Sequence, residues 1–170
     1  TANTPREIVE LEYPLRIERY GFVADACGAG RFRGGLGMVR DYRFLAEDCM
    51  LQVRSDRASI RPYGLYGGKP GTPSANILNP GENARALPSK FTLWPALGDV
   101  FRCQLAGGGG WGDPLERDPA RVLRDVRDDK ITVEFAAREH GVVIDTTTWT
   151  VDSEATVRLR AAARARGAGS

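Results

Sequence analysis

The sequence is short of the residues that most often build metal centres and catalytic triads. His140 is the only histidine among 170 residues, and Cys27, Cys49 and Cys103 lie too far apart for chelating spacing. A Ser-His-Asp or Cys-His arrangement would have to use His140. On spacing alone, the chain contains neither a metal site nor a complete set of catalytic residues.

Long apolar runs and a large net charge are also missing. No stretch approaches the roughly eighteen apolar residues of a membrane helix, and the opening residues 1–5 lack the regions of a signal peptide. The 24 basic and 22 acidic residues leave a net charge of +2, too balanced for a nucleic-acid surface. Widely spaced cysteines, odd in number, indicate free thiols. We therefore expect a cytoplasmic protein that binds neither membranes nor nucleic acids.

Glycine and proline, by contrast, are plentiful, with 20 and 10 residues, and most precede residue 115. Short apolar-polar alternations between them predict strands. The expected strands cover residues 13–23, 38–45, 50–54, 91–93 and 100–105. Residues 60–73 carry too much glycine and proline for a helix or a central strand.

The pattern changes at Asp118. Asp118-Pro119 is typical of a helix start, and a second helix is expected over 133–139, with Thr132 as its cap and Gly141 as its end. A short strand at 142–144 and a last helix from Asp152 follow. The sequence thus predicts an α+β fold: a β-rich irregular antiparallel sheet or barrel-like region over 1–115, then two or three C-terminal helices over 116–170 of the same domain.

The stretch GAGRFRGGLG, residues 28–37, and the run Gly107–Gly110 raise the question of what so much glycine does. Neither is followed by the Lys-Ser or Lys-Thr of a phosphate-binding loop, and the dinucleotide pattern fits only with one spacing too long and between two strands. A nucleic-acid RGG segment would repeat in a low-complexity tail. A tight turn packed against another backbone or a ligand is the remaining interpretation.

Two interpretations are open for the two arginines near this turn, and two for the nearby cysteine thiol. Arg31 and Arg33 either grip an anion together or each pairs with a surface acid. Cys27 is either a thiol activated by these arginines or, as we favour, a buried inert one. His140, near a helix end, is expected to face solvent or the helix dipole, and the acidic patch of Asp125, Asp128 and Asp129 is expected to be solvated.

Seven stretches, in order and covering nearly the whole chain, resemble the C-terminal part of hydantoinase B/oxoprolinase proteins. They are NTPREIVELEYPLRIERY (3–20), GAGRFRGGLGMVRDYRF (28–44), SDRASIRPYGLYGGKPG (55–71), LPSK (87–90), GDVFRCQLAGGGGWGDPLERDPARVLRDV (98–126), AAREHGVV (136–143) and VDSEATVRLRAAARARG (151–167). Two departures stand out: Ala26-Cys27 replaces a usual Ser-Gly, and His140 replaces a usual tyrosine. The first tells against Cys27 as a nucleophile shared by the family.

The resemblance implies one half of an ATP-dependent enzyme complex that hydrolyses a cyclic amide such as a hydantoin, 5-oxoproline or a lactam. It implies ATP with Mg at a hydantoinase A-like partner and a divalent metal in the rest of the B component, with no cofactor on this chain. A related ketone carboxylase of the acetone or acetophenone type, or a non-catalytic scaffold module, is the alternative. The catalytic residues stay unassigned.

A loop facing substrate or a neighbouring subunit is expected from the two glycine stretches and their flanks. Its candidate residues are Asp25, Cys27, Gly28, Gly30, Arg31, Arg33, Gly34, Gly35, Asp56, Arg57, Gly107, Gly108, Gly109 and Gly110.

Overall fold

The computed structural model describes residues 4–167 and confirms the predicted α+β fold. Two compact units interleave along the chain. The sheet unit comprises the residues up to Gly21, Met38–Ile60 and Pro73–Ala106, and the helical unit comprises Phe22–Gly37, Arg61–Thr72 and the residues from Gly107 onward. Within 4–167 no helix combines the length and apolar composition needed to cross a lipid bilayer.

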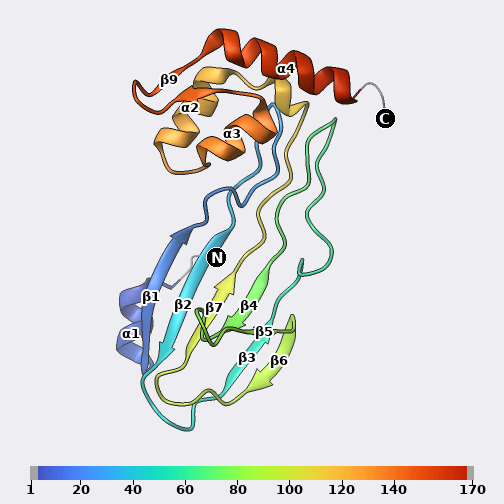
Figure 1. Ribbon diagram of the computed structural model, residues 1–170. Helices are drawn as coiled ribbons and strands as arrows, with labels where there is room; N and C mark the ends of the chain where they lie inside the picture. The colour runs from blue at the N-terminus through green and yellow to red at the C-terminus, as the bar shows by residue number, and fades with distance from the viewer. Residues whose placement is uncertain (1–3, 168–170) are drawn as a thin grey trace. The chain divides into compact units, whose positions relative to one another are not determined.

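A five-stranded antiparallel sheet forms most of the sheet unit (Figure 1). Its strands, in spatial order, are β1 (Leu15–Phe22), β2 (Met38–Phe44), β7 (Val100–Gln104), β4 (Ala75–Leu78) and β5 (Arg85–Leu87). Tyr42 of β2 lies opposite Phe101 of β7, and their rings stack with centroids 6.4 Å apart. Cross-strand aromatic pairs of this kind stabilise an antiparallel register.

A charged pair occupies the same register. Asp41 of β2 is buried and lies directly opposite Arg102 of β7. The Arg102 Nε and Nη2 atoms donate to the two Asp41 carboxylate oxygens at 2.8 and 2.6 Å. This two-bond geometry compensates the cost of burying the carboxylate.

The strands predicted from alternating residues are confirmed as β1, β2, β7, β3 (Leu51–Arg54) and β6 (Lys90–Leu93), the last two forming a separate antiparallel pair. In the sheet unit, three elements were not predicted: α1 (Arg6–Glu12), β4 and β5. Helix α1 follows Pro5 without a side-chain cap and buries no residue, so it lacks the signals that identify helices in a sequence. Strand β5 has only three residues, and the buried face of β4 carries the polar Asn76 beside Leu78, so neither shows an apolar-polar alternation.

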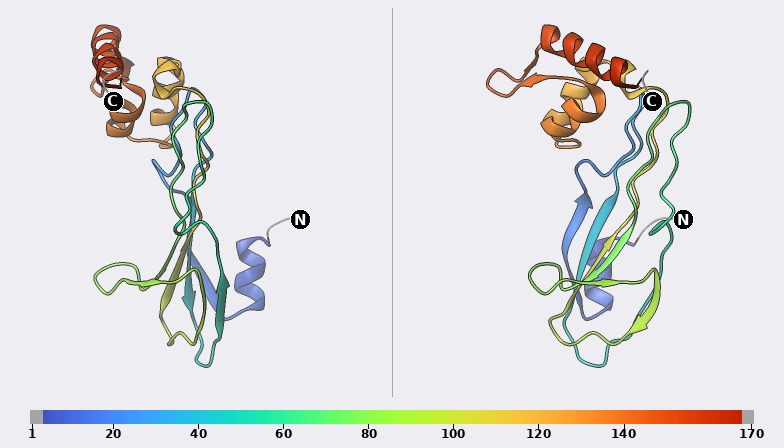
Figure 2. Two further views of the ribbon diagram at one scale, coloured as in Figure 1. Left: turned by 90° about the vertical axis from the view of Figure 1, so that its right-hand side faces the viewer. Right: turned by 45° about the vertical axis from the view of Figure 1, so that its right-hand side comes forward.

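The helical unit contains a 3-10 helix, three α-helices and a short hairpin (Figures 1 and 2). These elements are η1 (Pro114–Glu116), α2 (Pro119–Arg127), α3 (Val133–His140), β8 (Ile144–Asp145), β9 (Thr150–Val151) and α4 (Ser153–Gly167). The predicted caps are confirmed: Asp118 accepts a bond from Ala120 N, Thr132 accepts one from Phe135 N, and Gly141 ends α3 with a φ of 61°. Three C-terminal helices were within the expected number.

The main hydrophobic cluster also lies in this unit. Helices α2 and α3 pack their apolar faces together, and the segment entering β8 closes one side. The buried members are Cys27, Ala29, Val122, Val126, Ile131, Phe135, Ala136, Val142 and Ile144. Apolar burial of this kind is the main favourable contribution to folding, and here it anchors the loop that carries Cys27 and Ala29.

Three extended segments pack backbone against backbone in the helical unit, and we call them the glycine bundle: residues 26–37, 61–72 and 107–112. A side chain at Gly34 would collide with the carbonyl of Gly108, and one at Gly68 with the carbonyl of Gly110. One at Gly109 would collide with the carbonyl of Tyr63. The glycines are therefore required by the closeness of neighbouring main chains.

Replacement of two adjacent glycines by alanine tests this explanation. Gly34→Ala should lower the free energy of unfolding by roughly 3 kcal/mol, because the new Cβ meets main-chain atoms that cannot rotate away. Gly35→Ala should leave it within about 1 kcal/mol, since a Cβ there meets no atom within 4 Å. Urea denaturation followed by circular dichroism measures both. Equal losses for the two variants would contradict the packing explanation.

Candidate functional site

Most glycine N–H groups of the glycine bundle donate hydrogen bonds inside the protein. Gly28 N donates to Gly108 O at 2.8 Å, and Gly34 N donates to Gly28 O at 2.9 Å. Gly108 N donates to Gly35 O at 2.9 Å, and Gly110 N donates to Lys69 O at 2.9 Å. A phosphate-binding loop needs free N–H groups pointing at its ligand. The glycines thus hold segments together, as the tight-turn interpretation predicted.

Arg33 is committed to a buried ion pair. Its Nε and Nη2 atoms donate to the carboxylate of Asp125 at 2.9 and 3.1 Å, and its Nη1 atom donates to Gly34 O at 2.9 Å. Arg117, a residue that the sequence did not single out, donates from Nη2 to the same carboxylate at 2.7 Å. The expected solvated position of Asp125 is wrong: its carboxylate is buried between two guanidinium groups.

The pKa of Asp125 reflects this environment. Burial favours the neutral carboxyl and by itself raises the pKa, but hydrogen bonds and charge from Arg33 and then Arg117 outweigh it and hold the pKa below its usual value. Asp125 is therefore a carboxylate near neutral pH. It balances two buried cations and is not available as a general acid.

Arg31 does not join Arg33 in gripping an anion. Its side chain is half exposed, and the nearest acid is the similarly exposed Glu116, 3.9 Å away. Each arginine therefore has its own acidic neighbour, but only the partner of Arg31 is a surface acid, as the alternative to a shared grip had it, because Asp125 is buried. Only Arg31 keeps a charge that faces solvent.

Asp25 fastens the start of α3. Its two carboxylate oxygens accept bonds from Thr132 N at 2.7 Å and Thr132 Oγ1 at 2.8 Å. The backbone of Asp25 has a φ of 63°, a conformation that Asp adopts more readily than most residues. The side chain thus has a structural role in joining the loop to the helix.

A polar pocket of about 280 Å³ lies beside Asp25 and Cys27. Its lining combines three cations with two acids: Arg61, Lys69, Arg138, Asp25 and Glu139, together with Cys27, Ala29, Pro70, Thr72 and Phe135. Lys69 and Arg138 pair with Glu139, whereas Asp25 accepts bonds from Thr132 and Arg61 donates to Gly71 O at 2.6 Å.

Glu139 pairs with two of the cations that line this pocket. Its carboxylate accepts bonds from Lys69 Nζ and Arg138 Nε, each at 2.8 Å. Burial raises the pKa of Glu139, and the bonds from Lys69 and Arg138 more than reverse that effect, so the pKa lies below its usual value. Glu139 is consequently ionised near neutral pH and is a poor proton donor.

Cys27 is a buried thiol. Burial raises its pKa to about 11, although the charge of Arg33 acts in the opposite direction. A thiol with so high a pKa is protonated near neutral pH and is a weak nucleophile. The favoured interpretation of an inert Cys27 agrees with this environment, and all three cysteines are free thiols.

His140 is fully buried, so the expected solvent-facing position is wrong. Its Nδ1 atom lies 3.1 Å from Pro114 O and donates to it. Burial is the main reason that the pKa of His140 is lowered, which keeps the ring neutral. Packing against Phe135, with ring centroids 5.9 Å apart, makes it part of the core.

The remaining candidates, Asp56 and Arg57, belong to the sheet unit. The Asp56 carbonyl accepts a bond from Ser74 Oγ at 2.5 Å, and the Arg57 carbonyl accepts one from Ser74 N at 3.1 Å. Their side chains are exposed. The structure therefore gives them a local role in fixing the backbone around Ser74.

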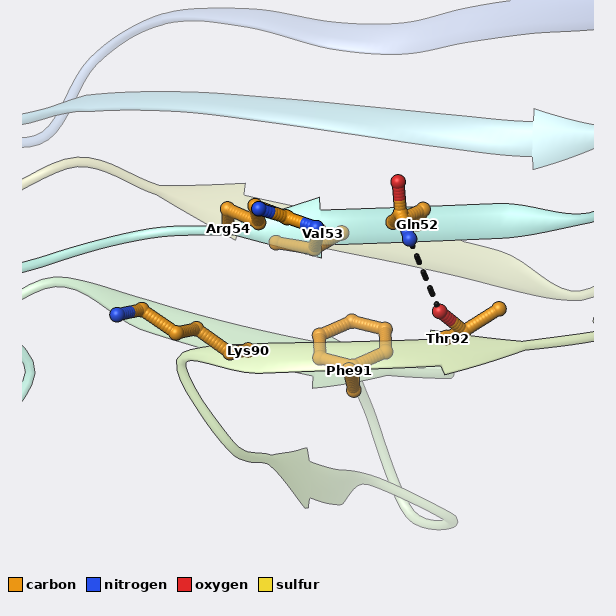
Figure 3. A pocket seen from close by; sticks show the side chains of 6 residues that line it. All are labelled: Gln52, Val53, Arg54, Lys90, Phe91 and Thr92. Carbon is orange, nitrogen blue, oxygen red and sulfur yellow. Dashed lines mark hydrogen bonds between the residues drawn. The ribbon is translucent and has the colours of Figure 1, made fainter.

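A hollow of about 350 Å³ lies on the β3–β6 pair of the sheet unit (Figure 3). Gln52 donates to Thr92 Oγ1 across it at 3.4 Å, and Val53 lies opposite Phe91. Arg54 and Lys90 face each other at one end, two like charges in register. The lining offers no acid or histidine that could activate Thr92 or Lys90, so it carries no catalytic interpretation.

Metal ligands do not converge in the part of the chain that the structure describes. Within residues 4–167, no group of three or more His, Cys, Asp or Glu side chains is placed to hold an ion. The buried acid Asp125 is already bonded to two arginines.

Asparagine at position 125 tests the buried ion pairs. Asp125→Asn should lower the free energy of unfolding at pH 7 by roughly 3 kcal/mol, since it leaves the guanidinium groups of Arg33 and Arg117 buried without a counter-charge. Asp128→Asn, at an exposed pair with Lys130 on the same helix end, should change it by less than about 1 kcal/mol. Urea titration measures both, and a similar small loss in each would contradict the assignment.

The same carboxylate predicts a pH dependence. Because its folded-state pKa is lowered, its stabilisation is present at neutral pH and declines once the pH falls below about 4, the ordinary value for Asp. Unfolding measured between pH 7 and pH 3 should show a larger loss for the native chain than for Asp125→Asn. Parallel curves would argue against a lowered pKa.

Alkylation tests the assignment of Cys27. At pH 8 iodoacetamide should modify Cys27 in the folded chain roughly a hundredfold more slowly than in urea, because few thiolates form and access is blocked. The less buried Cys49 serves as the internal comparison in peptide mass spectrometry. Rapid labelling of Cys27 in the folded chain would show that the thiol is activated.

Comparison with known proteins identifies the family of this chain. The hydantoinase B/oxoprolinase family matches residues 1–114. An uncharacterised protein of Methanocaldococcus jannaschii is 40% identical over 93% of this chain and 28% of its own length. Caprolactamase subunit beta of Pseudomonas jessenii is 33% identical over 82% of the chain and 25% of its own length.

Two solved structures share the fold. The ATP-dependent caprolactamase of Pseudomonas jessenii superposes with a TM-score of 0.82 at 32% identity, over 92% of this chain and 28% of the other. An acetone carboxylase solved without nucleotide superposes with a TM-score of 0.85 at 22% identity, over 98% and 27%. This chain thus spans about a quarter of the length of these relatives. It belongs to the hydantoinase B/oxoprolinase family.

Proposed function

We propose that this chain provides the glycine-packed part of an ATP-dependent enzyme assembly that hydrolyses a cyclic amide, such as a hydantoin, 5-oxoproline or a lactam. The observation that carries the proposal is the similarity to caprolactamase: 33% sequence identity over 82% of this chain, with a TM-score of 0.82. The likeness includes both the glycine bundle and the C-terminal helices, since it covers 92% of the chain in space.

The chain by itself holds an incomplete active site in this proposal. Three of its acidic side chains are occupied by internal partners: Asp125 by two arginines, Glu139 by Lys69 and Arg138, and Asp25 by Thr132. A catalytic acid or base must be within reach of substrate and free to exchange a proton. The chemistry therefore requires groups from outside this chain.

Two partners follow from the proposal: a hydantoinase A-like subunit that binds ATP with Mg, and the remaining hydantoinase B portion with its divalent metal. The residues of this chain do not fit a metal site, because ligands do not cluster within residues 4–167. Its glycine stretches do not fit a nucleotide phosphate either, because main-chain carbonyls accept the N–H groups of Gly28, Gly34, Gly108 and Gly110. We therefore derive no metal-dependent or ATP-dependent step from this chain.

The candidate loop residues receive two roles within the proposal. Gly28, Gly34 and Gly107–Gly110 set the shape of the backbone beside the catalytic centre. Arg31, exposed at the bundle, faces substrate or a neighbouring part of the assembly. Asp25 and Cys27 line the adjacent polar pocket.

Reconstitution tests the function. The chain, the remaining B portion and the A-like subunit should together hydrolyse ATP in the presence of a hydantoin, 5-oxoproline or caprolactam and release the ring-opened acid. The same mixture without this chain should be inactive, and so should the chain alone. Hydrolysis of a cyclic amide by the isolated chain would refute the proposal.

The same mixture distinguishes the carboxylase alternative. ATP turnover that requires bicarbonate and a ketone such as acetone, with no response to cyclic amides, would assign the assembly to ketone carboxylation. Full activity without this chain would instead make it a dispensable scaffold module.

A further inference from the structure

Three aromatic rings cluster on the surface of the helical unit. The Trp111 ring lies 5.6 Å from the ring centroid of Phe32 and 5.5 Å from that of Tyr66. The residues remain exposed, with 48% of Phe32, 79% of Tyr66 and 42% of Trp111 accessible to solvent. Together with Arg31 we call them the aromatic face. Exposed apolar clusters on a folded chain commonly mark interaction surfaces.

The backbone beneath the aromatic face is held by hydrogen bonds between three segments. Phe32 N donates to Trp111 O at 3.0 Å, and Trp111 N donates to Phe32 O at 2.9 Å. Leu65 N donates to Gly110 O, and Gly112 N donates to Leu65 O, both at 2.9 Å. The rings are therefore presented on fixed main chain, so little ordering is needed when a partner binds.

Tyr66 is held in an unfavourable backbone conformation. It occupies the turn closed by Gly68 N donating to Leu65 O at 2.9 Å, and φ is 50° at Tyr66 and 89° at Gly67. Positive φ at both central residues is typical of a type I′ turn, where Asn, Asp or Gly is preferred at the first of them. An aromatic residue there costs local stability. Its exposed ring suggests what is gained: a contact outside this chain.

Arg31 gives the aromatic face a charge. Its guanidinium carbon lies 5.9 Å from the centre of the Phe32 ring, and Glu116 approaches no closer than 3.9 Å. Both side chains of that pair are half exposed, so the arginine charge is only weakly neutralised. Trp, Tyr and Arg are the residues most enriched at the energetic centres of protein interfaces.

We propose that the aromatic face is a docking surface for the remaining hydantoinase B portion, which meets it with an apolar patch and a carboxylate opposite Arg31. This inference rests on the proposed function. The relatives are about four times as long as the region they share with this chain, so the same fold sits in them beside a large amount of further protein. Aromatic rings on rigid backbone next to a weakly neutralised cation suit such an interface.

Hydroxyl-radical footprinting of the complete assembly, compared with this chain alone, tests the proposal. Oxidation of Phe32, Tyr66 and Trp111 should fall at least fivefold when the remaining B portion is present, with or without the A-like subunit. Unchanged oxidation would overturn the proposal. Protection that appears only after the A-like subunit is added would overturn it as well, because the face would then belong to that partner.

Variants separate docking from folding. Tyr66→Asn should leave the melting temperature within about 3 °C of the native chain, because asparagine suits the turn. It should nevertheless weaken binding to the remaining B portion by roughly tenfold or more, and Phe32→Ala should do the same. Trp94→Ala removes another exposed aromatic ring, 68% accessible and in the sheet unit, and should leave binding unchanged.

Native binding by Tyr66→Asn and Phe32→Ala would overturn the proposal, as would a native chain that binds no B portion. Footprinting and binding need no turnover, so the docking result is independent of the activity test. An assembly that protects the rings but opens no cyclic amide would refute the proposed function and leave the docking surface in place.

Discussion

Close contact between main chains is the constraint on which the helical unit depends. Three extended segments lie so near one another that glycine is the only residue without a clash at positions such as Gly34, Gly68 and Gly109. The segments bond mainly through main-chain N–H and C=O groups. This contact between main chains therefore sets the positions of the aromatic rings and of the loop at Cys27.

Buried charges join the bundle to the helices. Arg33 leaves the bundle and meets Asp125 of α2, while Arg117 completes the pair and also donates to the Arg31 carbonyl at 3.0 Å. On the other side Asp25 holds the start of α3 through Thr132. Two candidate site residues of the sequence, Arg33 and Asp25, thus join loops to helices. Removing one partner of such a buried pair leaves the other charge uncompensated.

Local signals in the sequence identified most of the secondary structure, because alternation, helix caps and glycine stops act within a few residues. They located α2 from Asp118-Pro119 and α3 from Thr132 and Gly141. They missed the roles of Asp125 and His140, since burial depends on segments far away in the chain: Arg33 lies 92 residues from Asp125. Arg117 and Glu139 carried no motif, and only the folded arrangement reveals their partners.

The interleaved order of the two units has a consequence for synthesis on the ribosome. The last stretch of the sheet unit ends at Ala106, and the third segment of the glycine bundle begins immediately after it. During translation, the five-stranded sheet has all its strands by that point, whereas the earlier glycine segments still lack their neighbour. Residues 26–37 and 61–72 can bond to each other through Lys69 N and Ala29 O, but most of the hydrogen bonds between segments of the bundle form only once residues 107–112 have emerged.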